Sequence, residues 1–98
     1  GGENIPVKYV EDILYEDPRV QDAAIVAMPD PRLGERACAF VICRDSQTLD
    51  MKAMQDFLGA HGVAKVYWPE RLEVVAELPR TANGKVRKAD LRARLGKL

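Results

Sequence analysis

The sequence predicts a small α+β domain in which about three helices cover a mainly three-stranded sheet, in the order α-β-β-α-β-α. Three kinds of segment support this class. Some have apolar residues at helical spacing, two short runs are apolar almost throughout, and one run alternates apolar and polar residues. The chain has 98 residues, of which 47% are hydrophobic and 31% charged. That length and balance suit a single globular domain over residues 1–98.

The first half of the chain predicts one helix and two strands. Apolar positions at spacings of three, three and one, beginning at Val7, predict an amphipathic helix of about two to three turns, which Pro18 ends. Residues 20–28 have the composition of a strand, and their middle part, AAIVA, is apolar on both faces. We therefore expect this strand to lie in the centre of its sheet. A turn-rich connection over residues 29–35 leads to a second strand, residues 37–43.

The second half begins with a helix that either Thr48 or Asp50 can cap. Its apolar side consists of methionines, a phenylalanine and a leucine, which we interpret as core residues. His61 lies near its end, where a partly charged imidazole suits the negative end of the helix dipole. No partner acid or nucleophile accompanies this histidine, so we expect no catalytic role for it. Residues 65–70 then form a short extended segment.

A third strand and a last helix complete the predicted fold. Residues 71–77 alternate apolar and polar side chains, which predicts a half-buried strand with Leu72, Val74 and Ala76 on its inner face. Residues 88–96 predict a helix in which two leucines four positions apart face the core and the other faces are basic.

The two cysteines, Cys38 and Cys43, lie in one predicted strand. Their odd separation places them on opposite faces, so they cannot bridge each other. With one distant histidine they do not form a zinc site. We interpret them as buried thiols of a reduced, cytoplasmic protein.

The hydropathy of the chain and its first residues bear on where the protein is located and whether the chain is complete. No stretch of 18 apolar residues occurs, so no membrane span is predicted. The start of the sequence has neither a signal-peptide pattern nor an initiating methionine, which indicates a fragment of a longer chain.

Charge is unevenly distributed although the net charge is zero. Residues 79–98 contain seven basic residues and one acidic residue, and the first 78 residues carry the compensating excess of acids. Such a basic end suits phosphates, an acidic partner or solvent. The nearby aromatic residues, Tyr67 and Trp68, do not interleave with the basic residues, so we expect no nucleic-acid partner.

The segment with the clearest chemical signal is the turn over residues 78–88, LPRTANGKVRK. Asn83-Gly84 favours positive φ and therefore a tight turn. Lys85 follows directly, and a basic helix begins after it. A lysine at such a turn is most often a solvated surface residue, because loops are normally exposed and polar. It can also be a cation that reaches into a site formed by another domain.

Several familiar sites are excluded by the residues around this turn. A phosphate-binding P-loop needs a glycine at position 79 and a Ser or Thr at position 86, but Pro79 and Val86 stand there. The sequence contains no G-x-G-x-x-G, no H-E-x-x-H, no nucleophile elbow and no metal-ligand set. We therefore expect a domain that completes an active site on another domain.

Residues 78–92, LPRTANGKVRKADLR, resemble the closing motif of the adenylate-forming enzymes. These include acyl-CoA synthetases, peptide-synthetase adenylation domains and firefly luciferase. Residues 1–5, GGENI, resemble the motif that follows the interdomain hinge of that family. The similarity covers essentially the whole chain, and further matching positions are Glu11, residues 17–20, residues 23–26, Pro29-Asp30 and Gly34-Glu35. Arg80 and Arg87-Lys88 are more similar to acyl- or aryl-CoA ligases than to peptide synthetases.

This resemblance implies the mobile C-terminal lid domain of an ATP-dependent acyl- or aryl-CoA ligase, inactive alone. The N-terminal AMP-binding domain and the hinge would lie upstream, and that missing domain would bind Mg²⁺. In the first orientation of the lid, the lysine matching Lys85 would reach the α-phosphate of ATP and the carboxylate of the acid. Thr81, Asn83 and Gly84 would form the loop that supports it. In the second orientation, Gly1, Gly2 and Glu3 would border the path of the coenzyme A pantetheine.

The physics agrees with these implied roles. Adenylation brings two anions together, and a fixed ammonium reduces their repulsion. Glycines at positions 1 and 2 let the backbone approach a slender thiol arm. The turn also resembles the site at which protein acetyltransferases modify acyl-CoA synthetases, which makes such an enzyme a candidate partner at Lys85. Acetylation would remove the charge that adenylation uses. The isolated domain is expected to hold no cofactor.

A different class of function is also compatible with the residues. The basic C-terminal end could belong to a stand-alone module that binds an acidic protein or nucleic acid. Such a module would bind in a salt-sensitive manner without any partner domain.

Overall fold

The computed structural model describes residues 4–32 and 34–95, and it confirms the predicted α+β class and element order. The predicted site residues Gly1, Gly2 and Glu3 lie outside the described residues. The elements in chain order are α1 (Val7–Leu14), β1 (Val20–Asp30), β2 (Gly34–Cys43), α2 (Met51–Ala60), the short 3₁₀ helix η1 (Lys65–Tyr67), β3 (Arg71–Val74) and α3 (Lys88–Leu95). Within the described ranges no helix is long and apolar enough to cross a membrane.

The sheet has the strand order β1-β2-β3. β1 and β2 pair antiparallel, from Val20 opposite Cys43 to Asp30 opposite Gly34. β3 runs parallel to β2, with Cys38 beside Arg71. The expectation that residues 20–28 form the central strand is therefore wrong, since β2 is the strand with a described neighbour on each side. A strand that is apolar on both faces must be buried by elements packed on both faces of the sheet. An edge strand can be buried in this way as well as a central one.

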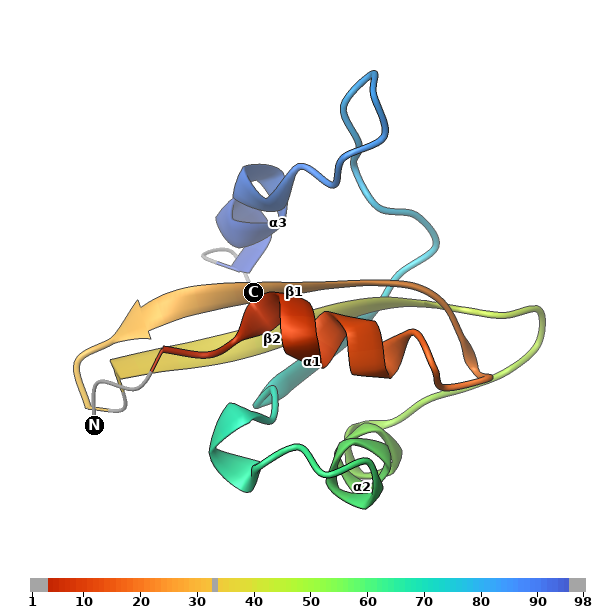
Figure 1. Ribbon diagram of the computed structural model, residues 1–98. Helices are drawn as coiled ribbons and strands as arrows, with labels where there is room; N and C mark the ends of the chain where they lie inside the picture. The colour runs from red at the N-terminus through yellow and green to blue at the C-terminus, as the bar shows by residue number, and fades with distance from the viewer. Residues whose placement is uncertain (1–3, 33, 96–98) are drawn as a thin grey trace.

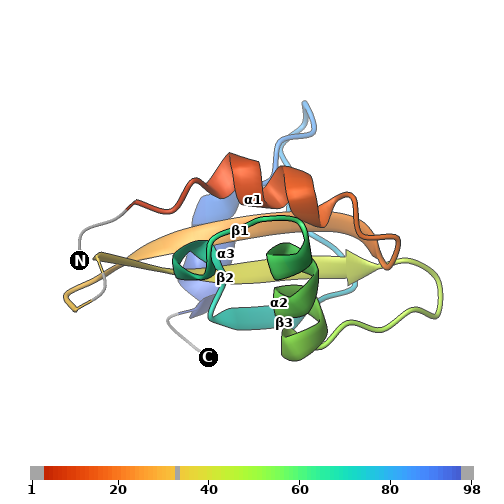
Figure 2. The ribbon, with the colours of Figure 1, turned by 60° about the horizontal axis from the view of Figure 1, so that its bottom comes forward.

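Helices provide this cover on both faces (Figures 1 and 2). α1 and α2 lie on one face, where Leu14, Met54 and Leu58 pack with odd-numbered residues of β1 such as Ile25. α3 lies on the other face, where Leu91 packs with even-numbered strand residues in a second, smaller cluster. The alternation of strand side chains thus divides the core into two layers. Cys38 belongs to the second layer and Cys43 packs against the first, which confirms that they face opposite sides. Burial raises the pKa of the Cys38 thiol to about 11.

The sequence identified β1 and β2 as strands but predicted where they end less accurately. The predicted connection over residues 29–35 is mostly strand, because Pro29 pairs with Glu35 and Asp30 with Gly34. Pro29 has no N–H to donate, and an edge strand tolerates this. Residues 65–70 are not extended throughout, since Lys65–Tyr67 form η1.

The third strand is shorter than predicted and its inner face is only partly as expected. β3 ends at Val74, which is 53% exposed, and Ala76 is exposed as well. Leu72 packs against the first core layer as predicted, but Val75 packs against the second. The chain leaves the sheet after the N–H of Val75 donates to the carbonyl of Val41, at 2.9 Å. From there it crosses to the face that carries α3.

Local contacts fix the helices that frame the sheet. Asp50, one of the two predicted caps, is the N-cap of α2, and its carboxylate accepts from the N–H of Ala53 at 2.8 Å. His61 is the C-cap, where its ring stacks on Phe57 and its Nδ1 lies 3.0 Å from the Phe57 carbonyl oxygen.

Before β1, Asp17 is buried, and Arg19 donates to its carboxylate through the backbone N–H and two guanidinium nitrogens, at 2.8 to 2.9 Å. Burial alone would raise the pKa of Asp17, but these hydrogen bonds and the charge of Arg19 outweigh it and lower that pKa.

Candidate functional site

The predicted turn forms a small hairpin between β3 and α3. Arg80 and Val86 form an antiparallel bridge, and the N–H of Thr81 donates to the carbonyl of Lys85 at 2.8 Å. Residues 81–85 are all exposed. In both ribbon views the hairpin, drawn in blue, stands clear of the helices and the sheet (Figures 1 and 2). The residue at its tip is therefore presented to solvent and away from the domain's own core.

The tip has a defined internal structure. Gly84 has φ of +89°, and its N–H donates to the carbonyl of Thr81 at 3.0 Å. The hydroxyl of Thr81 accepts from the N–H of Lys85 at 3.1 Å and donates to the side-chain oxygen of Asn83. The structure thus brings together Thr81, Asn83, Gly84 and Lys85 in one turn, as the sequence indicated. Positive φ explains why glycine occupies position 84.

The entry to the hairpin is attached to the body of the domain by Arg80. One guanidinium nitrogen donates to the carbonyl oxygen of Gly84 at 2.6 Å, and another forms an ion pair with Asp22 of β1. The hydroxyl of Tyr15, just after α1, donates to the same carboxylate and to the carbonyl of Ala23. Burial alone would raise the pKa of Asp22, but hydrogen bonds from Tyr15 and Arg80 outweigh it and lower that pKa.

The exit from the hairpin is attached as well. Lys88, the first residue of α3, forms an ion pair with Glu11 of α1 at 2.7 Å. The same Glu11 oxygen accepts from the N–H of Ile25, which lies on the outer edge of β1, at 2.7 Å. Arg87 pairs with Asp90 at 3.2 Å. The hairpin is therefore a projecting arm whose two ends are fixed to the α1–β1 unit.

Lys85 differs from the cations around it. Arg80, Arg87 and Lys88 each pair with a carboxylate, whereas Lys85 has no hydrogen-bond or ion-pair partner for its ammonium among the described residues. An unpaired ammonium at the tip of an anchored arm can contact an anion on another surface. The ion pairs also leave fewer free cations for an acidic or nucleic-acid partner than the count of basic residues indicated.

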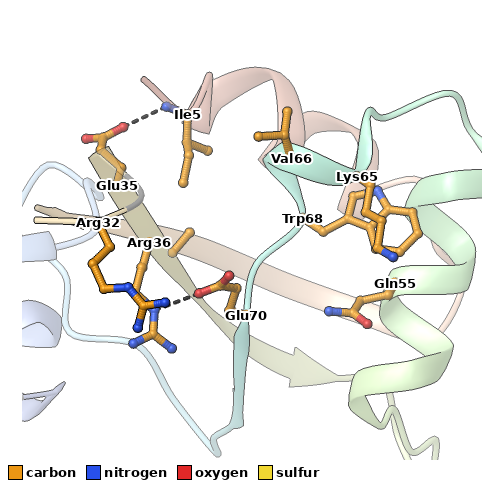
Figure 3. Close-up of a pocket in the computed structure, with 10 residues that line it drawn as sticks. Ile5, Arg32, Glu35, Arg36, Gln55, Lys65, Val66, Trp68 and Glu70 are labelled. Carbon is orange, nitrogen blue, oxygen red and sulfur yellow. Dashed lines mark hydrogen bonds and ion pairs between the residues drawn. The ribbon is translucent and has the colours of Figure 1, made fainter. Parts of the chain in front are cut away.

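A second region adjoins the N-terminal segment that the sequence implicated. The backbone N–H of Ile5 donates to the carboxylate of Glu35 at 2.6 Å, and Ile5 lines a pocket of about 340 Å³. Figure 3 shows this pocket between the β1–β2 hairpin, η1 and α2, with Trp68 at one side. No residue of the Lys85 hairpin lines it. The pocket and the Lys85 hairpin are thus separate surfaces of the described part of this domain.

The polar groups of the pocket come from segments far apart in sequence. Arg32 and Arg36 lie at the β1–β2 hairpin, Lys65 lies in η1, and Glu70 pairs with Arg36 at 2.6 Å (Figure 3). The sequence did not indicate the three cations Arg32, Arg36 and Lys65 as a group, because no local motif connects them.

No group of three or more His, Cys, Asp or Glu residues that could hold a metal ion occurs within residues 4–32 and 34–95.

Comparisons with known proteins agree with this geometry. The family model described as the AMP-binding enzyme C-terminal domain matches residues 9–85. The medium-chain fatty-acid–CoA ligase of Escherichia coli K12 is 45% identical over 93 residues, which are 94% of this chain and 16% of that protein. The 2,3-dihydroxybenzoate-AMP ligase of Bacillus subtilis is 45% identical over 94 residues, which are 94% of this chain and 17% of that protein.

A solved structure shows the same fold. The crystal structure of a Brucella canis acyl-CoA synthetase matches with a TM-score of 0.86 and 31% identity, over 98% of this chain and 18% of that chain. The chain therefore spans about a sixth of the length of the curated relatives it matches. The family model covers residues 9–85, from within α1 to the hairpin tip, and the relatives cover 94% or more of the chain. The chain belongs to the family of C-terminal domains of AMP-binding enzymes.

Proposed function

We propose that this chain, residues 1–98, is the mobile C-terminal domain of an ATP-dependent acyl- or aryl-acid ligase and that Lys85 is its catalytic residue. It would act on an active site formed by an N-terminal AMP-binding domain of the same enzyme, which would bind ATP and Mg²⁺. The observation that carries the proposal is the contrast between Lys85 and its neighbours. Within the described residues its exposed ammonium has no hydrogen-bond or ion-pair partner, whereas Arg80, Arg87 and Lys88 each pair with a carboxylate.

The chemistry assigned to Lys85 is charge stabilisation in the first half-reaction. A carboxylate oxygen of the acid attacks the α-phosphorus of ATP, the bond to the β-phosphate oxygen breaks, and pyrophosphate leaves. The products are an acyl-adenylate and pyrophosphate. Two anions meet in this step, and negative charge builds on the α-phosphate oxygens. A fixed ammonium placed beside both groups lowers the barrier because it stabilises the transition state more than the separated anions.

In the second half-reaction an acceptor displaces AMP from the acyl-adenylate. For a coenzyme A ligase the acceptor is the thiol, which forms a thioester as the acyl–phosphate bond breaks. We propose that Gly1, Gly2 and Glu3 border the pantetheine path in this step. The pocket lined by Ile5 carries both signs of charge: the cations Arg32, Arg36 and Lys65 and the carboxylates of Glu35 and Glu70, of which Glu70 pairs with Arg36. The names of the relatives include both a CoA ligase and an AMP ligase, so the acceptor is a separate question from adenylation.

A half-reaction experiment on the complete enzyme tests the role of Lys85. ATP–pyrophosphate exchange with a panel of medium-chain and aryl acids measures adenylation, and thioester formation from supplied acyl-adenylate and coenzyme A measures the second step. We expect Lys85→Ala to lower adenylation by roughly 10²–10³-fold, as loss of one transition-state contact does, and to change the second step little. Arg94→Ala, which removes an exposed cation of α3, is the matched control and should leave both steps unchanged. Equal losses in both half-reactions would show that Lys85 does not act in adenylation alone.

Regulation at the same residue follows from its exposure. We propose that a protein acetyltransferase modifies Lys85, because acetylation would remove the charge used in adenylation and the ammonium is accessible at the hairpin tip. Mass spectrometry of the protein from its native host would reveal the modified fraction, and a Lys85 that is always unmodified would contradict this. We place the enzyme in the cytoplasm, where ATP and coenzyme A are available.

A further inference from the structure

The guanidinium of Arg80 joins the tip of the hairpin to the sheet. One nitrogen donates to the carbonyl oxygen of Gly84, the residue covalently bound to Lys85, at 2.6 Å. Another nitrogen pairs with Asp22, which is 58 residues away in sequence. Arg80 thus contacts both the backbone next to Lys85 and the first strand of the domain. A planar guanidinium can hold two such acceptors in a fixed geometry, whereas an ammonium is a point charge without that planarity.

Asp22 is itself held in place. It follows a register irregularity between Val20 and Asp22, and such bulges turn a side chain out of the regular ladder. Its carboxylate accepts from the hydroxyl of Tyr15 and from the N–H of Ala23 as well as from Arg80. The side chain of Asp22 is 18% exposed, so this ion pair is better shielded from solvent than the pairs on the helix surfaces. The anchor is therefore a fixed point on the α1–β1 unit.

The hydrogen bonds within the hairpin hold its turn together, but they do not attach the tip to the sheet. A two-stranded hairpin is marginally stable in water, and this one has one antiparallel bridge, between Arg80 and Val86, with an exposed tip. The other attachments are the Lys88–Glu11 ion pair and the packing of Leu78 and Val86 against the second core layer, and none of them touches the tip. Arg80 acts on the peptide carbonyl that precedes Lys85. We propose that Arg80, held by Asp22, is a positioning residue that fixes the direction in which the hairpin presents Lys85.

This inference rests on the proposed function of Lys85 and makes a distinct claim. Arg80 could instead contact the nucleotide directly, as an exposed cation near the tip. The two roles differ in their kinetics. Loss of a positioning contact lowers kcat for adenylation while KM for ATP stays nearly constant, because the nucleotide is bound elsewhere. Loss of a direct contact made equally to bound ATP raises KM. Asp22 has the same charge as the phosphates and would not bind them itself, so its neutralisation acts through Arg80, and the change in kcat or in KM then separates the two roles.

The first experiment measures order at the tip in the 98-residue chain and requires no substrate. Backbone ¹⁵N relaxation should give order parameters of about 0.85, typical of rigid backbone, for the amides of Gly84 and Lys85 in the wild type. We expect values below about 0.6 in Arg80→Ala and in Asp22→Asn, with Arg80→Lys intermediate. Asp56→Asn, which breaks the remote Lys52–Asp56 pair, is the matched control and should leave the tip rigid. Unchanged order in both Arg80→Ala and Asp22→Asn would overturn the inference.

The second experiment measures adenylation in the complete enzyme with the same variants. We expect Arg80→Ala and Asp22→Asn each to lower kcat about 10- to 100-fold, as small misplacements of a catalytic group do, with KM for ATP within about twofold. The double variant should be no slower than Arg80→Ala alone, because both substitutions remove one contact. A raised KM with unchanged kcat, or full activity of Asp22→Asn, would overturn positioning. Full activity of Lys85→Ala would instead refute the proposed function, while the relaxation experiment would still decide whether Arg80 orders the tip.

Discussion

Gly84 offers a sharp test of whether the shape of the hairpin matters for function. Its φ of +89° lies in the region that L-residues rarely adopt, and a Cβ added at this position would meet no atom within 4 Å. Gly84→Ala therefore perturbs the backbone without creating a steric clash. The cost of forcing a non-glycine residue into left-handed backbone is about 1–2 kcal/mol.

The size of the expected loss of activity depends on this backbone cost being confined to the hairpin tip. The tip is exposed, so a rearranged turn loses few core contacts and competes directly with the native turn. A penalty of about 1–2 kcal/mol lowers the population of the native turn by up to roughly 5- to 30-fold. Because Lys85 follows Gly84 directly, ATP–pyrophosphate exchange by the complete enzyme should fall by a similar factor. Gly84→Asn should retain more activity than Gly84→Ala, since asparagine tolerates positive φ better than alanine.

Gly62 provides the matched control for this prediction. It has φ of +82° and, like Gly84, no atom within 4 Å of an added Cβ, but it lies just beyond the end of α2. Gly62→Ala should carry a similar backbone cost, visible in chemical unfolding, and leave exchange unchanged. The reasoning fails if Gly84→Ala exchanges as fast as the wild type, or if Gly62→Ala loses as much exchange activity as Gly84→Ala.

Two further predictions concern the stability of the domain. The pKa of Asp17 lies below its unfolded value because of Arg19, so its contribution to stability is complete above about pH 4 and is lost as the pH falls through the folded pKa. Urea unfolding should therefore show Asp17→Asn to be less stable at pH 7 by about 1–3 kcal/mol, with a difference that narrows below about pH 4. At Gly59, an added Cβ would lie 2.9 Å from the indole of Trp68, whose N–H is held by the carbonyl of Val63. Gly59→Ala should destabilise the fold by about 1 kcal/mol, since overpacking of about 1–3 kcal/mol outweighs the gain in helix propensity, and combining it with Trp68→Phe should cost less than the sum of the two changes.

The sequence predicted the elements whose signals are local. The spacing of Val10, Ile13 and Leu14 identified α1, and the run AAIVA identified β1, because periodic burial shapes the sequence of each element directly. Turn chemistry likewise placed Lys85 after a glycine with positive φ. The predicted end of β3 was wrong because its alternation continued to residue 77, while pairing with β2 stops at Val74. Alternation of apolar and polar residues in one segment does not show where its hydrogen-bonded pairing with a neighbouring strand ends.

Only the tertiary structure showed which distant segments contact the hairpin and which line the pocket. It placed β1 at the edge of the described sheet, and it brought Asp22 to Arg80 across 58 residues of sequence. It also gathered three cations around the pocket near Ile5. The sequence by itself determined the element order and the residue at the hairpin tip, since both depend on local backbone preference and hydrophobic period. The ion pairs Arg80–Asp22 and Lys88–Glu11, which hold the hairpin to the α1–β1 unit, join segments far apart in sequence and exist only after the domain has packed.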